Sequence, residues 1–120
     1  MLNCIHVYCN IPGRDILDDY CSRVAFLNLT NSFINIKDAI ATIQSQKVDL
    51  AFFDFDASDL HLINIVPVQT KVILLTTLLE HEIAKYTLSV NGTLRQPCSF
   101  DKFLKVVHLA TNNERLTIPN

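Results

Sequence analysis

Short apolar runs alternate along the chain with segments whose apolar residues recur every three or four positions. The runs are typical of buried strands, and the periodic segments are typical of amphipathic helices. The predicted strands cover residues 2–8, 26–32, 48–54, 70–77 and 91–97. The predicted helices cover residues 13–26, 36–46, 58–66, 78–89 and 99–110. The chain is therefore predicted to fold as strand–helix units in series.

Strands that alternate with helices favour a parallel sheet whose strands are joined by right-handed helical crossovers. The units fit an α/β, doubly wound, flavodoxin-like (βα)5 fold with a five-stranded parallel sheet in the order 2-1-3-4-5. In that order the binding crevice lies where the first and third strands end. The predicted domain covers residues 1–112. Residues 113–120 are predicted to be a C-terminal tail or the start of a linker, because they are polar with a late proline.

Individual residues mark the helix ends and the helix faces that are expected to be buried. Ser58 and Ser99 are predicted N-caps, and Pro67 is expected to end the third helix. The first helix is predicted to turn four residues toward the core: Ile16, Leu17, Tyr20 and Val24.

Composition narrows the class of protein. With 120 residues, of which 49% are hydrophobic and 18% charged, the chain is long and apolar enough to bury one core. A net charge of −2 offers no basic surface for nucleic acid, so direct binding to DNA or RNA is not expected. The apolar runs are too short to span a membrane. No basic segment followed by an apolar leader opens the chain, so a cytoplasmic location is expected.

Neither the cysteines nor the histidines predict a metal centre or disulfides. The four cysteines lack a C-x-x-C spacing and are expected to be reduced and mostly buried. The histidines are scattered without ligand spacing. Their positions are His6, His61, His81 and His108.

The segment "VDLAFFDFDASDL", residues 48–60, runs from a strongly apolar strand into three acids, Asp54, Asp56 and Asp59. Buried strands avoid carboxylates because their desolvation is costly. Two interpretations follow. Either Asp54 performs chemistry at the strand tip, or the acids mark the point where the chain returns to water.

The order of these segments resembles the receiver domains of bacterial two-component response regulators, and most closely those of LytTR-type transcription regulators. "VDLAFFDFD" resembles the third strand of that family, which implies that Asp54 occupies the phosphoacceptor position. "KVILLTT" resembles the fourth strand, which implies a switch hydroxyl at Thr77. "NGTLRQPCSFDKFLKVV" resembles the fifth strand and last helix, with Pro97 as a candidate cis proline, and "RDILDDYCSRV" resembles the first helix.

The sequence departs from the family where the chemistry is expected. Two acids that help to hold Mg²⁺ in the family correspond to Tyr8 and Cys9, and residues 1–14 contain no Asp or Glu. The family lysine before the proline corresponds to Gln96. Phosphoryl transfer depends on positioning and on cations that neutralise the phosphoryl oxygens. The resemblance therefore implies a degenerate site in which Asp54 is phosphorylated poorly or not at all.

Three residues are candidates to compensate for these losses. Asp56 could supply a second carboxylate, making Asp54 and Asp56 a weak metal pair, although two carboxylates alone bind Mg²⁺ loosely. Arg14 could serve as a substitute cation. Arg95 is expected to point away from the site because neighbouring strand residues face opposite sides. No cofactor or metal is expected in the favoured interpretation, and Mg²⁺ only in the alternative.

The favoured interpretation is a pseudo-receiver, a signalling module without enzymatic activity that acts through protein–protein interaction. The alternative is a working receiver, phosphorylated at Asp54 by a histidine kinase and controlling a C-terminal DNA-binding domain. A flavodoxin-like protein with a different small-molecule ligand is a third possibility, but no glycine-rich phosphate loop supports it. Partners are expected to be a histidine kinase or another signalling protein. A homodimer is possible through the fourth helix, fifth strand and fifth helix, where the exposed candidates are Glu82, Lys85, Arg95 and Lys102.

Overall fold

A computed structural model describes residues 1–57, 59–112 and 116–117 of the chain. The main sheet contains β1 (Leu2–Val7), β2 (Leu27–Phe33), β3 (Leu50–Asp54), β4 (Lys71–Thr76) and β6 (Gly92–Arg95). The longer helices are α1 (Ile11–Ser22), α2 (Ile36–Ser45) and α4 (Phe100–Asn112). The shorter elements are the 3-10 helix η1 (Leu60–Ile65), α3 (Glu80–Ile83), β5 (Ser89–Val90) and β7 (Leu116–Thr117).

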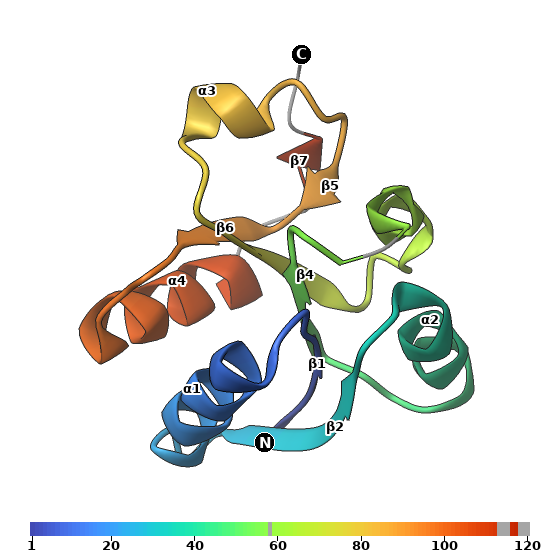
Figure 1. The fold of residues 1–120 in the computed structure, drawn as a ribbon. Coiled ribbons are helices and arrows are strands. Elements are labelled where there is room, and N and C mark those ends of the chain that lie inside the picture. The colour runs from blue at the N-terminus through green and yellow to red at the C-terminus, as the bar shows by residue number, and fades with distance from the viewer. Residues whose placement is uncertain (58, 113–115, 118–120) are drawn as a thin grey trace.

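The main sheet is parallel, with the order β2-β1-β3-β4-β6. Because β6 is the fifth strand of this sheet along the chain, the order is the predicted 2-1-3-4-5, and the flavodoxin-like fold is confirmed. Helices α1 and α4 cover one face of the sheet, and α2 covers the other (Figure 1). The carboxyl ends of β1 and β3 therefore meet at the middle of one edge.

The core forms because the central strands are apolar on both faces. Every residue of β3 is buried, as expected of a strand in the middle of a parallel sheet covered by helices. On the face toward α2, Val7 and Phe53 join one apolar cluster. On the face toward α1 and α4, Cys4 and Phe52 join the other.

One predicted helix is a 3-10 helix, and another is much shorter than expected. Residues 60–65 form a 3-10 helix preceded by Asp59 in the left-handed conformation, and the predicted cap Ser58 lies outside the described residues. Only Glu80–Ile83 is α-helical in the segment 78–89. The side chain of Asn64 explains part of this difference. Its amide donates to the carbonyl of Thr87 at 2.8 Å and accepts from the Ser89 N–H at 2.7 Å, which holds the later residues in extended backbone.

The other helices lie close to their predicted bounds. Ser99 caps α4 as predicted, since its hydroxyl accepts from the Lys102 N–H at 3.1 Å. In α1, Leu17 is buried as predicted, but Ile16 is 52% exposed, so its place in the buried face was wrong. The helical repeat turns residue 16 toward solvent once residues 17 and 21 face the sheet.

Part of the predicted tail belongs to an ordered element. Leu116–Thr117 forms β7, which pairs antiparallel with β5. The other residues of the segment 113–120 lie outside the described residues, so the tail or linker stays a prediction. None of the helices described in the structure is long and apolar enough to cross a membrane.

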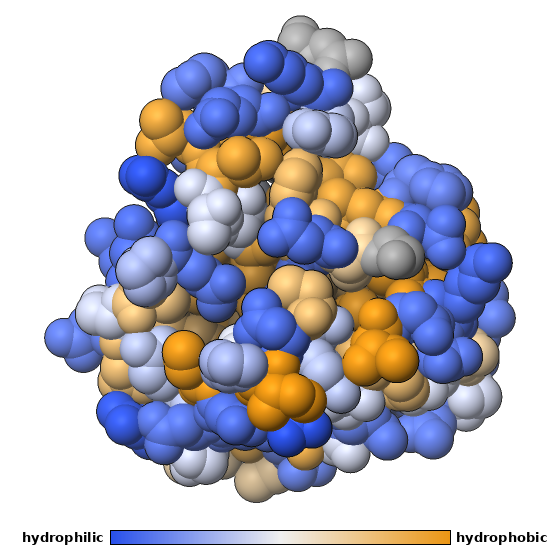
Figure 2. Space-filling model, viewed as in Figure 1, coloured by the Kyte–Doolittle hydropathy of each residue, from blue (hydrophilic) through white to orange (hydrophobic). Residues whose placement is uncertain are grey.

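The four cysteines differ in how deeply they are buried. All four cysteines are free thiols, with Cys4 and Cys21 buried, Cys98 half-buried and Cys9 exposed. Burial raises the pKa of Cys4 and of Cys21 to about 12, so both thiols stay protonated. On the surface seen in Figure 2, apolar side chains are interspersed with hydrophilic ones.

Candidate functional site

Asp54 ends the central strand β3 at the carboxyl edge of the sheet. It is only 7% exposed although it is the last residue of the strand. Strand β1 flanks it on one side and β4 on the other. A carboxylate so deeply placed needs hydrogen-bond donors, because burying it without them is costly.

His6 supplies the first donor. Its Nε2 lies 2.9 Å from Oδ1 of Asp54, and the imidazole is fully buried. An ionised carboxylate only accepts hydrogen bonds, so the proton between these atoms sits on Nε2. Among the described residues no group bonds Nδ1 of His6. The Nε2–H tautomer therefore fits, since a proton on Nδ1 would be a buried donor without an acceptor.

Strand geometry explains why these two side chains meet. Side chains alternate between the faces of a sheet, so His6 lies on the same face as Cys4, and Asp54 on the same face as Phe52. Both therefore face α1 and α4. Since β1 and β3 are neighbours, with His6 paired in register with Phe52, the two polar side chains converge at the ends of adjacent strands.

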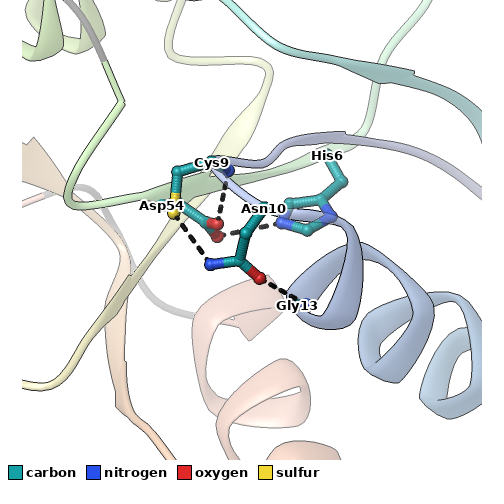
Figure 3. Close-up of polar contacts among 5 residues, drawn as sticks. All are labelled: His6, Cys9, Asn10, Gly13 and Asp54. Carbon is teal, nitrogen blue, oxygen red and sulfur yellow. Dashed lines mark hydrogen bonds and ion pairs between the residues drawn. The ribbon is translucent and has the colours of Figure 1, made fainter.

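The loop after β1 supplies the second donor. The N–H of Cys9 donates to Oδ2 of Asp54 at 3.0 Å, so both carboxylate oxygens are engaged by the chain itself (Figure 3). The next residue, Asn10, caps α1 by accepting from the Gly13 N–H at 2.7 Å. A Cβ at position 13 would lie 3.0 Å from Oδ1 of Asn10, so glycine leaves room for this cap.

The Cys9 thiol borders the same carboxylate. Nδ2 of Asn10 donates to its sulfur at 3.4 Å. Partial desolvation of the thiol, and then the Asp54 and Asp56 carboxylates, raise the pKa of Cys9 above its ordinary value. The thiolate is therefore disfavoured, and Cys9 lacks the electropositive surroundings of a reactive cysteine.

Strand β4 ends one residue earlier than predicted, and the role of Thr77 as a switch hydroxyl stays a prediction. Strand β4 ends at Thr76, which is 3% exposed, and its hydroxyl accepts from the Leu78 N–H at 2.9 Å. Thr77, the predicted switch hydroxyl, is exposed. The buried hydroxyl at the strand end is thus Thr76, because the strand stops one residue earlier than predicted.

The loop after β6 forms the last part of the edge. The Gln96–Pro97 peptide bond is cis, which confirms the prediction for Pro97. Gln96 occupies the predicted lysine position, and its N–H donates to the Thr76 carbonyl at 2.7 Å. Arg95 and Lys102 border a groove of about 330 Å³ beside this loop.

Solved structures of response regulator domains share this fold. The chain superposes on the response regulatory domain of protein mrkE from Klebsiella pneumoniae with a TM-score of 0.75 and 17% identity, covering 92% of this chain and 95% of that one. It superposes on the signal receiver domain of the putative response regulator NarL from Mycobacterium tuberculosis with a TM-score of 0.79 and 14% identity, covering 92% and 95%. The chain has the receiver fold.

A longer regulator matches over only part of its length. The response regulator RcsB from Salmonella typhimurium superposes with a TM-score of 0.78 and 12% identity, covering 95% of this chain and 64% of RcsB. No family model matches the sequence, and no curated protein matches it significantly. The likeness to LytTR-type receivers stays a prediction.

The metal ion implied by receiver chemistry does not fit the residues present. Mg²⁺ requires an octahedron of oxygen ligands. At the two positions predicted to have lost their acids, Tyr8 presents a ring that contacts Arg14, and Cys9 presents a thiol. The Asp54 carboxylate is bonded to His6 and to Cys9. Within the described part of the chain, no group of three or more His, Cys, Asp or Glu residues could hold a metal.

The compensating residues are placed elsewhere. Arg14 lies over the Tyr8 ring, 5.5 Å from its centroid, and bonds Asp15 at 3.3 Å. Hydrogen bonds to Tyr8 and then to Asp15 raise its pKa. Asp56 is exposed, two residues beyond Asp54, and Arg95 is exposed as well. Among the contacts found for the described residues, none joins Asp54 to any of these three side chains.

His6 is the site residue that the sequence analysis missed. The histidines lack metal-ligand spacing, so the sequence predicts no site role for His6. Its signal was different: it is a polar residue inside an apolar strand, and the predicted strand order sets that strand next to the one ending in Asp54. A buried polar side chain needs a partner, and Asp54 was the one within reach.

Proposed function

We propose that this chain is a pseudo-receiver, a signalling module of the two-component type that works through protein–protein contacts and not through phosphorylation of Asp54. In this proposal it is a cytoplasmic module without enzymatic activity. The observation that carries the proposal is that His6 and Cys9 hydrogen-bond both oxygens of the nearly buried Asp54 carboxylate.

The chemistry of phosphorylation explains why this observation matters. To accept a phosphoryl group, a carboxylate oxygen must be free to attack, and cations must neutralise the charge that spreads over the phosphoryl oxygens. Here Oδ1 faces a buried imidazole at 2.9 Å and Oδ2 faces a backbone N–H at 3.0 Å. Each hydrogen bond draws electron density from its oxygen and makes that oxygen a weaker nucleophile at a nearly buried site. Gln96, which is neutral, replaces the lysine expected of a working receiver.

The proposed partner is a histidine kinase or another signalling protein. The proposed homodimer face consists of α3, which is only four residues long, together with β6 and α4. Arg95 and Lys102 are exposed on this face. Glu82 is half-buried, and its carboxylate accepts from the Leu79 N–H at 3.0 Å. A C-terminal DNA-binding domain, as in the alternative interpretation, would make the module part of a transcription regulator.

Direct phosphorylation tests the proposal. We expect no gain of mass when the purified protein is incubated with acetyl phosphate and Mg²⁺, and no bound fluoride signal in ¹⁹F NMR with beryllofluoride. The matched variant restores the missing groups by Tyr8→Asp, Cys9→Asp and Gln96→Lys and frees Oδ1 of Asp54 by His6→Val. It is expected to gain phosphoryl mass that Asp54→Asn abolishes.

Phosphorylation of the natural sequence at Asp54 would contradict the proposal. A gain of mass in the natural sequence that disappears in Asp54→Asn would establish the working receiver with a relaxed metal site. A gain that persists in Asp54→Asn would place the modification on another residue, and would leave Asp54 unmodified as proposed.

A further inference from the structure

A groove of about 420 Å³ lies between α1 and β2, away from Asp54. Its lining comes from the second half of α1 and from most of β2. The lining residues are Asp18, Cys21, Ser22 and the segment 27–32. Strand β2 lies at the outer edge of the sheet with α1 beside it (Figure 1). The groove thus follows an edge strand.

The two edges of the sheet differ in how well they are protected from further pairing. Strand β6 has four residues and carries Arg95. Strand β2 has seven residues, with the sequence LNLTNSF, and contains neither a charged residue nor a proline. Within the described residues β2 pairs with β1 alone. Proteins usually blunt an exposed edge with charges, prolines, shortness or bulges, and of these β2 has only a bulge.

A bulge interrupts the inner side of β2 but leaves much of its outer side usable. The register with β1 shifts after the pair Cys4 and Leu29, so that Ile5 pairs with Asn31. Thr30 is left out of the pairing, and its hydroxyl donates to the Cys4 carbonyl at 3.2 Å. The bulge bends the edge locally. An added strand would therefore pair on one side of Thr30 and span only part of β2.

Asp18 places a carboxylate in the groove, and none of the described residues that line the groove is a cation that could pair with it. Its neighbours on α1 have cations: Asp15 bonds Arg14 at 3.3 Å, and Asp19 bonds Arg23 at 2.7 Å. Oδ1 of Asp18 is buried, and no described residue gives it a hydrogen bond. No lysine or arginine lines the groove. A buried carboxylate oxygen without a donor is costly, and a bound cation would relieve that cost.

We propose that the outer edge of β2 binds an extended segment of a partner protein, which adds a strand to the sheet and places a lysine or arginine against Asp18. Backbone hydrogen bonds would supply affinity and the basic side chain would supply selectivity, as in other strand-addition complexes. A second copy of this chain is a poorer occupant, because neither β2 nor the groove offers the cation that Asp18 needs.

A pair of peptides tests this site on the whole chain. One probe alternates threonine and valine around a central lysine, and the other has glutamate in place of that lysine. We expect the lysine peptide to shift the backbone amide signals of residues 27–32 in ¹H–¹⁵N spectra and to slow their hydrogen exchange. Asp18→Asn should weaken that binding about fivefold, as for a partly exposed ion pair. Asp19→Asn should leave it unchanged because Asp19 is paired with Arg23.

Several outcomes would overturn the proposal. These are equal binding of both peptides, shifts that map away from β2, no shift at any soluble concentration, and binding that Asp18→Asn does not weaken. Light scattering tests whether a second copy of the chain occupies the edge of β2 instead. A concentration-dependent dimer with protected β2 amides would assign this edge to a second copy of the chain.

Discussion

The carboxyl edge of the sheet has two halves that share the receiver fold and differ in chemistry. In the half formed by β1 and β3, the acid of Asp54 is closed off by His6 and by the loop after β1. In the half formed by β4 and β6, Arg95 and Lys102 border a groove of about 250 Å³ that reaches Thr76. In one half the Asp54 carboxylate is hydrogen-bonded by the chain itself, and the other half keeps cations exposed at its surface.

In the proposed pseudo-receiver, this difference is the reason why the site keeps its position without its reactivity. Receiver chemistry needs both halves at once: a free carboxylate with a metal on one side, and a hydroxyl with a cation on the other. Here the first half has become part of the core through a buried histidine–aspartate contact. The second half remains open to partners, which agrees with a module that works by binding.

In the half formed by β1 and β3, removal of His6 is expected to cause the largest loss of stability. His6→Ala leaves the Asp54 carboxylate nearly buried without its side-chain partner, so we expect the free energy of unfolding to fall by about 3 kcal/mol. Urea denaturation followed by circular dichroism measures this change. His61→Ala is the matched control, because His61 is exposed, and it should change the stability by less than about 0.5 kcal/mol. Equal effects of the two variants would contradict the account.

Removing the carboxylate should be costly as well. Asp54→Ala leaves the His6 imidazole and the Cys9 N–H without their acceptor, and we expect a loss of about 2 kcal/mol in the same denaturation experiment. Asp56→Ala removes an exposed carboxylate two residues away and should stay within about 0.5 kcal/mol of the natural sequence. A stabilising effect of Asp54→Ala would mean that the carboxylate is strained and not satisfied.

More of the fold than of the site could be predicted from the sequence. Strand order followed from periodicity and alternation, because a buried parallel strand such as 50–54 has an unmistakable apolar run. The helix predicted over 78–89 is confirmed only for Glu80–Ile83. The side chain of Asn64 fixes residues 87 and 89 from a distance in sequence. Local pattern does not report such long-range hydrogen bonds.

The site shows the same limit. The position of Asp54 followed from its place after a buried strand, and the cis bond before Pro97 followed from the resemblance. The contact with His6 did not, because it depends on two strands whose register is fixed by packing. The end of the fourth strand was missed by one residue for a related reason: strand ends are set by hydrogen bonding, and Thr76 rather than Thr77 ends β4.

In the half formed by β4 and β6, the two neighbouring threonines are expected to differ in their contribution to stability. Thr76→Val removes the hydroxyl that accepts from the Leu78 N–H, so we expect a loss of about 1 kcal/mol. Thr77→Val changes an exposed side chain and should cost less than about 0.5 kcal/mol. Thermal unfolding of both variants distinguishes them. The reverse order would return the buried hydroxyl to Thr77.

The smallest expected effect concerns the Cys9 thiol. Its pKa is raised first by desolvation and then by the carboxylates of Asp54 and Asp56, so its alkylation by iodoacetamide should have a midpoint above pH 9.0. Asp54→Asn removes one negative charge, which lowers that pKa, raises the thiolate fraction at a fixed pH and speeds alkylation. Peptide mapping by mass spectrometry follows each thiol, with Cys98 as the control. An unchanged rate at Cys9 would place its thiol away from the Asp54 carboxylate.

The central claim is that Asp54 is held by His6, and a double-mutant cycle tests it most directly. The unfolding free energies of the natural sequence, His6→Ala, Asp54→Ala and the double variant give the coupling between the two side chains. We predict a favourable coupling of at least about 1 kcal/mol, as for contacting residues that share a hydrogen bond. Additive effects, with a coupling below about 0.5 kcal/mol, would contradict the account and leave Asp54 free to react.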